Sequence, residues 1–434
     1  MERPEVYYDV GRKDYWILNT RGDWITVNET GLKRQLRACG FSAKPREGEV
    51  LSDLDDCLNR VQRQFDVTYA GPLAGYQKGL TEMCGQRILI TSSPKLIMPR
   101  PGQFPILDKL LRNLFPDEQR LYVCGWLKIA YESLRESHLR PGQLLVLAGE
   151  VDSGKSFFQK IITEILGGRS AKPFRYMSGA TDFNSDLLGA EHLVIEDEIA
   201  STDIRARRAF GARIKDFTVN EVQSCHAKNR QAISLKPLWR VSLSLNEESE
   251  NLLILPPLDE SMGDKIILLK VSKAPFPMPT FTEAQRVALW ATLIRELPAF
   301  LHFLNKWEIP EGLKCDRFGV KHFHHPALVE ALDELTPEVR LLALIDLWFK
   351  TDDGLTTEKG SEIGHQNGFE GTADRLQMHL FASPLHGYEA KKLLTWPHAA
   401  ATYLSRLENK HPDRIQYRRT ASERIWVIKP RATG

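Results

Sequence analysis

Short apolar runs that end in turn residues alternate along this chain with longer stretches in which apolar residues recur every three or four positions. The first pattern predicts β-strands and the second predicts amphipathic helices. Residues 7–8, 15–18 and 24–27 are aromatic or β-branched runs separated by glycine- and aspartate-containing turns, so they predict three short strands.

Two helices are expected after these strands. The first begins near Asn28 or Thr30, since both side chains can cap a helix N-terminus. The second covers 52–65, and its three early aspartates are explained by the dipole at a helix start without a metal site. The proline-rich stretch 92–105 cannot be regular structure, and it closes an α+β region at 1–100. Helical periodicity then predicts a collar at 101–139.

The most specific signature follows the apolar run 144–148. The run ends at Gly149, and Gly154, Lys155 and Ser156 come after four intervening residues, which is the G-x-x-x-x-G-K-[ST] pattern. Apolar pairs spaced four apart after Ser156 predict a helix. A buried strand, a glycine loop and a helix in this order are the setting in which the pattern binds nucleotide phosphates.

This loop predicts a site for ATP and Mg²⁺. Backbone N–H groups wrap the phosphates, and the helix N-terminus adds partial positive charge. Lys155 is expected to be exposed and to reach the β- and γ-phosphates, and the Ser156 hydroxyl is expected to hold Mg²⁺. The expected nucleotide-binding residues are Gly149, Glu150, Val151, Asp152, Ser153, Gly154, Lys155, Ser156 and Phe157.

A second apolar run, 193–195, leads directly into Glu196, Asp197 and Glu198. In a phosphate-loop ATPase one such acid holds Mg²⁺ and the next activates the attacking water. The preferred frame gives the metal to Asp197 and the water to Glu198. The alternative frame uses Glu196 and Asp197, and a plain acidic helix cap is the third interpretation.

The alternating strand 239–245 ends at Asn246. Ligands bind at the carboxyl ends of strands in open α/β sheets, so Asn246 is expected to orient the water against the γ-phosphate. Runs 174–177 and 265–271 predict two more strands, and three prolines then end an α/β core at 140–280.

Two basic segments lie between the acidic run and Asn246. A helix at 201–217 has the apolar stripe Ala206, Phe210, Ile214 and Phe217, and its other faces carry Arg205, Arg207, Arg208, Arg213 and Lys215. Strands at 219–222 and 232–235 predict a hairpin whose tip carries His226, Lys228 and Arg230. Such cations can contact nucleic-acid phosphates, although a solvated basic surface has the same composition.

The C-terminal part predicts a helical subdomain at 281–335 and a winged-helix-like domain at 336–434. Its final helix, strand, turn and strand carry more basic than acidic residues, including Arg418 and Arg419, which suits DNA backbone contact. A protein-docking winged helix is the alternative. The run 322–325 contains three histidines, but without nearby cysteines it is expected to be a surface loop.

The composition excludes some classes of protein but does not identify a function. The net charge of +2 gives no global polyanion signal, so a basic nucleic-acid surface must be local. Six scattered cysteines suggest neither a zinc site nor a disulfide framework and fit a reducing compartment. Without a signal core or an apolar run of transmembrane length, a cytoplasmic protein with no membrane partner is expected.

The order of motifs resembles the superfamily 3 helicases, the AAA+-like ring helicases of viruses, phages and plasmids, and above all their primase-helicase branch. Residues 149–156 match motif A, 195–198 match motif B, the hairpin around Lys228 matches motif B′, and Asn246 matches motif C. The resemblance implies an ATP-dependent helicase in phage, plasmid or mobile-element replication. It also implies a hexameric ring on single-stranded or forked DNA, with ATP between subunits and the hairpin in the channel.

One part of the family pattern is missing. The family places an arginine finger shortly after motif C, yet no arginine lies between Arg240 and Arg286, and Lys265 occupies that neighbourhood. Three alternatives follow: Lys265 acts as the trans cation, Arg208 or Arg213 does so, or hydrolysis is slow.

Three other functions are alternatives to a helicase: an ATPase ring without unwinding, a guanine-specific protein and a primase. An ATPase ring without unwinding, such as an initiator or a defence-type signalling ATPase, has the same motifs. A guanine-specific protein would carry Asn-Lys-x-Asp, and 305–308 ends in Glu within a helical region. Residues before 140 show neither a paired Asp-x-Asp strand nor a zinc pattern, so a primase or polymerase is expected to be a separate partner chain.

Overall fold

The computed structural model describes residues 5–196, 204–228, 230–334, 336–350, 368–420 and 423–430. The chain divides into two compact units, Met1–Leu328 and Val329–Gly434.

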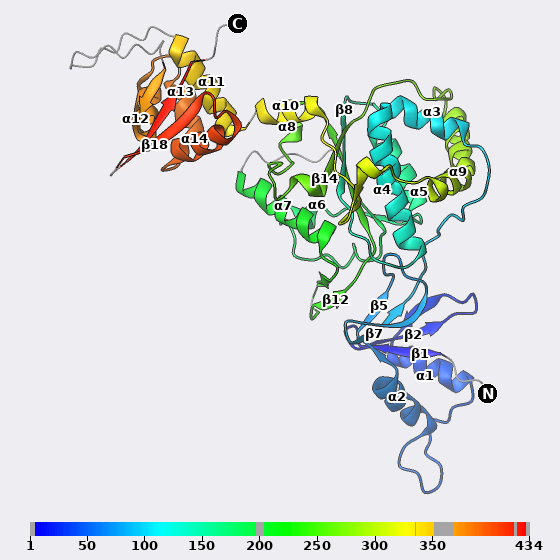
Figure 1. The fold of residues 1–434 in the computed structure, drawn as a ribbon. Helices are drawn as coiled ribbons and strands as arrows, with labels where there is room; N and C mark the ends of the chain where they lie inside the picture. The colour runs from blue at the N-terminus through cyan, green and yellow to red at the C-terminus, as the bar shows by residue number, and fades with distance from the viewer. Residues whose placement is uncertain are drawn as a thin grey trace, which may run out of the picture. The chain divides into compact units, whose positions relative to one another are not determined.

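The first unit begins with two small sheets and two helices, as the sequence predicts for an α+β region (Figure 1). Asn28 accepts a hydrogen bond from the Gly31 backbone and Ser52 from the Asp55 backbone, which confirms both helix starts. One sheet has the order β3-β2-β1-β4 and the other β5-β7-β6. The elements are β1 Val6–Asp9, β2 Asp14–Leu18, β3 Trp24–Val27, α1 Glu29–Ala38, α2 Asp53–Gln64, β4 Asp66–Val67, β5 Tyr69–Gly71, β6 Gly79–Met83 and β7 Gln86–Ile90.

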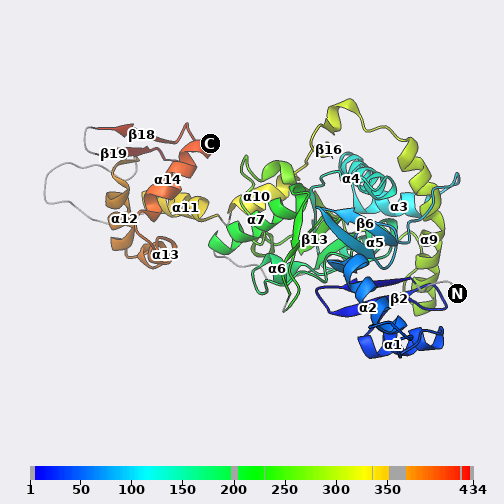
Figure 2. The same ribbon diagram turned by 90° about the horizontal axis from the view of Figure 1, so that it is seen from below.

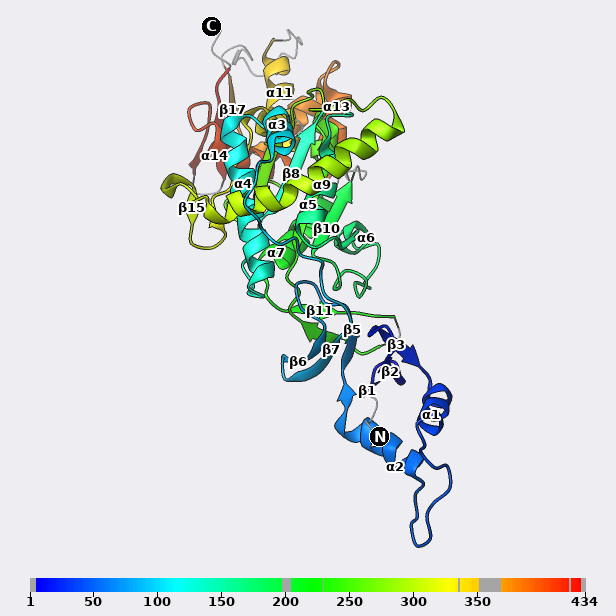
Figure 3. The ribbon, with the colours of Figure 1, turned by 90° about the vertical axis from the view of Figure 1, so that its right-hand side faces the viewer.

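A helical layer follows the proline-rich stretch. It contains α3 (Pro105–Leu114), α4 (Asp117–Arg135) and, much later in the chain, α9 (Glu283–Lys306), which crosses over α4 in Figure 3. The buried Glu296 of α9 accepts the Leu107 backbone N–H at 2.8 Å and so caps the start of α3. These helices share one apolar core with the central sheet.

The helix α9 corrects the expectation that no apolar run reaches transmembrane length. Among the described residues it is the one helix long and apolar enough to cross a membrane, with a mean hydropathy of 1.3 over its best window. That window is 44% buried inside the protein, and Leu297, Phe300 and Leu301 lie in the core. Packing within this unit therefore accounts for part of its apolar character.

The central sheet is parallel throughout and has the order β14-β8-β13-β10-β9. Figures 1 and 2 show α4 and α5 (Lys155–Ile165) on one side of it, and α6 (Phe174–Met177) and α7 (Ile204–Val219) on the other. The strand β13 lies between the loop-bearing β8 and the acid-bearing β10, so their carboxyl ends meet at one edge. The elements are β8 Leu144–Gly149, α5 Lys155–Ile165, β9 Ser170–Ala171, β10 His192–Glu196, β13 Arg240–Asn246 and β14 Ile266–Lys270.

Two predicted strands are wrong. Phe174–Met177 is a helical turn, α6, and not a strand, because its rings pack on α7 (Ile204–Val219): Phe174 lies 6.1 Å from Phe210. The predicted strand 219–222 is also absent, because Val219 ends α7 and the first hairpin strand, β11, is Gln223–Cys225. It pairs with β12 (Ile233–Leu235), which lies within the predicted strand 232–235.

The predicted burial of two side chains on α7 is wrong. Phe210, Ile214 and Phe217 are buried as expected, but Ala206 is exposed. Arg207, expected on the solvated face, is buried and donates a hydrogen bond to the Leu255 carbonyl at 2.9 Å.

Short elements complete the first unit and carry the chain into the second: α8 Ser249–Leu252, η1 Gly263–Lys265, η2 Glu311–Leu313, β15 Lys314–Cys315, β16 Gly319–Val320 and α10 Pro326–Glu334. The histidine run is not a free surface loop. Backbone hydrogen bonds join Leu268 of β14 to Phe323 and His325, so the run extends the sheet edge. Among the described residues no cluster of His, Cys, Asp and Glu is placed to hold a metal ion.

The second unit orders its elements as helix, strand, three helices and two strands, around a core that includes Trp348 and Trp426. A three-stranded antiparallel sheet has the order β17-β19-β18. This order agrees with the predicted ending of a winged helix. The elements are α11 Pro337–Lys350, β17 Phe369–Gly371, α12 Ala373–Ala382, α13 Gly387–Leu393, α14 Ala399–Lys410, β18 Ile415–Arg419 and β19 Arg424–Ile428.

Candidate nucleotide-binding site

The loop between β8 and α5 has the backbone of a tight phosphate cradle. Gly154 adopts φ 94° and Asp152 φ 60°, so the chain turns twice through the left-handed region before the helix begins. A Cβ atom on Gly149 would lie 2.5 Å from the Val271 carbonyl oxygen, so no larger residue fits there. Phe157, just inside α5, packs edge-on against Phe276 at 5.1 Å and fixes the helix start.

Lys155 is not exposed as expected; only 6% of the residue is accessible. Its ammonium group donates hydrogen bonds to the carbonyl oxygens of Gly149 at 2.8 Å and Glu150 at 2.7 Å. A buried ammonium needs acceptors, and the loop provides them. The lysine therefore folds back over its own loop, at the place where a polyphosphate would supply other acceptors.

Asn246 lies beside this lysine. In the sheet register Asn246 is paired with Gly149, and its Oδ1 accepts a hydrogen bond from Lys155 Nζ at 3.2 Å. The insertion of β13 next to β8 produces this contact. The structure thus brings together two of the residues that the sequence selected for different reasons.

The acidic run is described only up to its first member. Glu196 ends β10, its side chain is 30% exposed, and it lies 3.4 Å from Lys172 Nζ. Asp197 and Glu198 lie outside the described residues, so both frames remain predictions.

The residues around the loop fit Mg²⁺, which prefers oxygen ligands and retained waters. The Ser156 hydroxyl, at the start of α5, makes no hydrogen bond to another described residue and is partly exposed. Glu196 adds a carboxylate at the carboxyl edge of the neighbouring strands. Together they supply a hydroxyl and a carboxylate, the donors that a phosphate-loop metal uses.

Beneath the loop lies a buried polar network that the sequence analysis did not select. His192 of β10 contacts Ser242 of β13 at 2.8 Å through Nε2 and Thr163 of α5 at 2.7 Å through Nδ1. Gln159 of α5 donates to Ser242 Oγ at 2.8 Å. Complete burial lowers the pKa of His192 to about 3, so the ring is neutral. The sequence contains one signal for this network: His192, Gln159 and Ser242 are polar residues that lie among apolar ones.

Lys265 lies at the opposite edge of the sheet. It ends η1, directly before the five-residue strand β14, whereas the phosphate loop follows the carboxyl end of β8. At a rise of about 3.3 Å per residue the strand separates the two edges by about 16 Å. Lys265 therefore cannot reach the phosphate loop of its own chain.

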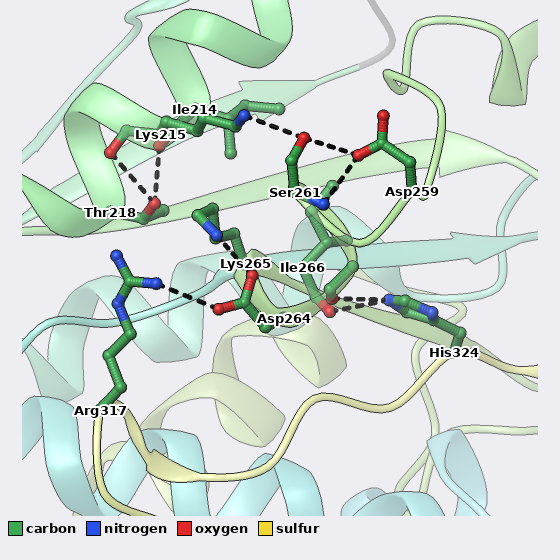
Figure 4. A network of polar contacts seen from close by, with 11 residues as sticks. Ile214, Lys215, Thr218, Asp259, Ser261, Asp264, Lys265, Ile266, Arg317 and His324 are labelled. Carbon is green, nitrogen blue, oxygen red and sulfur yellow. Dashed lines mark hydrogen bonds and ion pairs between the residues drawn. The ribbon is translucent and has the colours of Figure 1, made fainter.

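Around Lys265 is an open hollow of about 580 Å³, here named the basic pocket, whose charged lining residues are Arg213, Lys215, Asp216, Lys265 and Arg317. Figure 4 shows Asp264 between Lys265 and Arg317; its carboxylate lies 2.5 Å from the first and 3.2 Å from the second. Burial opposes ionisation of Asp264, but the hydrogen bond and charge of Lys265, aided by Arg317, outweigh it and lower the pKa.

Arg317 is the residue that sequence reasoning missed here. It lies far beyond Asn246 in sequence, and only the return of the chain after α9 brings it to Lys265. Of the alternatives named earlier, Arg208 is exposed on α7, and Arg213 donates to the Tyr176 hydroxyl at 3.0 Å and lies over that ring.

The predicted nucleic-acid residues fall in two places. His226, Lys228 and Arg230 are exposed on the connection between β11 and β12. Asn184 anchors its base by accepting the His226 backbone N–H at 2.7 Å and donating to the Ser224 carbonyl at 2.8 Å.

In the second unit, Arg418 and Arg419 are exposed on β18. Arg418 pairs with Glu370, and Arg419 lies opposite Arg424 in the register. The Arg424 guanidinium lies 4.1 Å from the centre of the Tyr417 ring, so this sheet presents cations and an aromatic side chain to solvent.

One solved structure with a similar fold aligns over almost the whole chain, and two others show weaker likeness. The C-terminal region of NrS-1 aligns over 99% of this chain and 97% of its own, with a TM-score of 0.54 at 13% identity. The SCCmec type IV Cch active helicase aligns over 95% of this chain and 73% of its own at a TM-score of 0.34 and 10% identity. JCV helicase aligns over 53% and 66% at a TM-score of 0.26 and 14% identity. No protein-family model matches, and no curated protein matches.

Proposed function

We propose that this chain is an ATP hydrolase that assembles into a hexameric ring and moves along single-stranded or forked DNA as a helicase. The observation that carries the proposal is the contact between Lys155 of the phosphate loop and Asn246 of the adjacent strand, at 3.2 Å. This pair gives the site both a phosphate ligand and a polar group that can sense the γ-phosphate.

The proposed chemistry assigns a role to each polar side chain at the carboxyl edge. Phosphate oxygens replace the loop carbonyls as acceptors for Lys155, and the loop amides bind the remaining charge. Ser156 and an acid of the 196–198 run would hold Mg²⁺, which would neutralise phosphate charge. Glu198 in the preferred frame, or Asp197 in the other, takes the proton of the attacking water, and Asn246 orients that water.

The proposed ring gives the basic pocket a purpose. Lys265 lies at the sheet edge about 16 Å from the edge that carries the phosphate loop, and Asp264 pairs with both Lys265 and Arg317. We assign this pair as the trans-acting cations that reach the nucleotide of a neighbouring subunit. Arg317 supplies the planar fork that Lys265 lacks, which answers the absence of an arginine shortly after Asn246.

The alternative is an ATPase ring that does not separate strands, such as an initiator or a defence-type signalling ATPase. The GTPase interpretation is weaker, because Asn305 and Lys306 end helix α9 rather than follow a strand. Under the helicase proposal a primase or polymerase activity belongs to a separate chain.

Strand displacement on a forked DNA duplex distinguishes the two ring hypotheses. The wild-type protein with ATP and Mg²⁺ is expected to release the labelled strand, and Lys155→Ala is expected to release none. Lys160→Ala is the matched control, because Lys160 is an exposed lysine on the same helix. ATP hydrolysis without strand release would favour the alternative ring.

Particle mass tests assembly independently. Mass photometry with ATP is expected to show a hexamer. Monomers alone at micromolar protein and saturating ATP would contradict the ring.

A further inference from the structure

A second cavity lies between the N-terminal sheets and the β11–β12 hairpin. Its volume is about 590 Å³, within the range of small-ligand sites, and we name it the junction cavity. Its walls are formed by the turn after β1, by β5 and the residues after it, and by the connection between β11 and β12.

The two sides of the junction cavity are held together by hydrogen bonds. The Ala74 backbone donates to the Leu188 carbonyl at 2.8 Å, and the Leu238 backbone donates to the Ala74 carbonyl at 2.9 Å. The buried Glu191 accepts the Gly75 N–H at 2.7 Å. The walls are therefore fixed relative to each other before any ligand arrives, which lowers the ordering cost of binding.

Two arginines line the cavity from different parts of the chain. Arg12 is held by Asp9, whose carboxylate accepts the Arg12 backbone N–H at 2.9 Å and lies 3.6 Å from its Nε. Arg230 comes from the hairpin connection, and its guanidinium makes no ion pair or hydrogen bond within the described part of the chain. Its Cδ would lie 3.8 Å from a Cβ on Gly11, which places the two arginines on neighbouring walls.

The charge of the lining leaves this pair available to an anion. Asp186 is the one acid among the lining residues, and it is exposed, while Asp9 is almost fully buried behind Arg12. Guanidinium groups bind phosphate through planar, paired N–H donors. The arginine side of the junction cavity thus suits one phosphate group.

The other side of the cavity is aromatic and apolar. The Tyr69 hydroxyl donates to the Pro72 carbonyl at 2.6 Å, which fixes the ring. A Cβ on Gly71 would lie 2.8 Å from the Tyr69 oxygen, so the ring folds closely over Gly71. Fixed aromatic rings stack with nucleobases whatever their sequence. Ile233 and Val10 add apolar lining.

We propose that the junction cavity receives one nucleotide of a single nucleic-acid strand, with its phosphate on Arg12 and Arg230 and its base on Tyr69. The same connection carries Lys228 and His226, so a strand that contacts those side chains continues into the cavity. The inference rests on the proposed function and deepens it, because it makes the N-terminal region part of the DNA path.

Binding of a fluorescein-labelled oligothymidylate at 50 to 300 mM salt tests the proposal. Arg12→Gln and Arg230→Gln are each expected to weaken binding by about tenfold at low salt. The double variant is expected to reduce the slope of log K against log salt by about 0.7, since the two arginines share one phosphate contact. Arg21→Gln, which removes an exposed arginine from the same region, is the control and is expected to bind like the wild type.

A photocrosslink places the base. An oligonucleotide carrying 5-iododeoxyuridine is expected to form an adduct with the peptide that contains Tyr69. The proposal is overturned if the arginine variants bind with the wild-type affinity and slope, if the adduct maps only outside residues 10–12, 68–72 and 225–233, or if thymidine monophosphate alone occupies the cavity while the strand does not. If these results occur in a protein that still unwinds DNA, the junction cavity proposal is wrong but the helicase proposal is not affected. A wild-type protein with no affinity for single-stranded DNA would contradict both proposals.

Discussion

The buried network beneath the phosphate loop makes a quantitative prediction for Ser242→Ala. One arrangement of hydrogens is consistent with these contacts: Thr163 donates to the Gln159 carbonyl at 3.1 Å, His192 Nδ1 donates to Thr163, and Ser242 donates to His192 Nε2. Ser242 also accepts the Gln159 side-chain amide at 2.8 Å. The serine is completely buried, so water cannot replace it.

Removing that hydroxyl leaves two buried polar groups without their partner, His192 Nε2 and one N–H of Gln159. Each such group costs about 1–3 kcal/mol, so the sheet is expected to lose about 2–6 kcal/mol of stability. Ser244→Ala is the matched control. Ser244 is equally buried on the same strand, but its hydroxyl has no hydrogen-bond partner among the described residues, so its loss is expected to leave stability unchanged or to raise it.

Hydrogen exchange measured by mass spectrometry on peptides from β10 and β13 suits this test, because it reports the opening of this sheet separately from the second unit. A Ser242→Ala variant whose opening free energy agrees with that of Ser244→Ala within 0.5 kcal/mol would refute the network argument.

Three further predictions concern His192 of the buried network, the acidic run at 196–198 and Arg317 of the basic pocket. Because burial holds the folded-state pKa of His192 near 3, below its ordinary 6.5, stability is full above pH 6.5 and falls below it by up to about 1.4 kcal/mol per pH unit; urea unfolding between pH 7 and 5 measures this slope, and a His192→Gln variant with the same slope would contradict it. Glu198→Gln is expected to bind ATP and stall, while Glu196→Gln stays active; single-turnover hydrolysis with the reverse order would select the other acidic frame. Arg317→Ala is expected to bind ATP with wild-type affinity but hydrolyse it about 10³-fold more slowly; a steady-state rate within twofold of the wild type would exclude Arg317 as the trans cation.

Local sequence patterns predicted what is decided locally. The helix starts near Asn28 and Ser52, the loop glycines and the burial of Phe210 and Ile214 follow from side-chain chemistry within a few residues, and the structure confirms them. The strand at 174–177 was wrong because a four-residue aromatic run fits a strand and a buried helical turn equally well, and only the packing of Phe174 on α7 decides between them.

Long-range contacts were beyond the sequence. The position of β13 between β8 and β10, which brings Asn246 to Lys155, is a matter of strand order that no local pattern encodes. Arg317 was missed for the same reason, since it reaches Lys265 only through tertiary folding. The burial of Lys155 depends on acceptors that its own loop supplies once folded.

The ATP hydrolysis rate with and without single-stranded DNA tests the central claim most directly. The wild-type protein with Mg²⁺ is expected to hydrolyse ATP, and its rate is expected to rise several-fold when DNA is added, while Lys155→Ala shows no hydrolysis in either condition. Equal rates for the wild type and Lys155→Ala, or no hydrolysis by the wild type in the presence of DNA, would contradict the assignment of this chain as a DNA-driven ATPase.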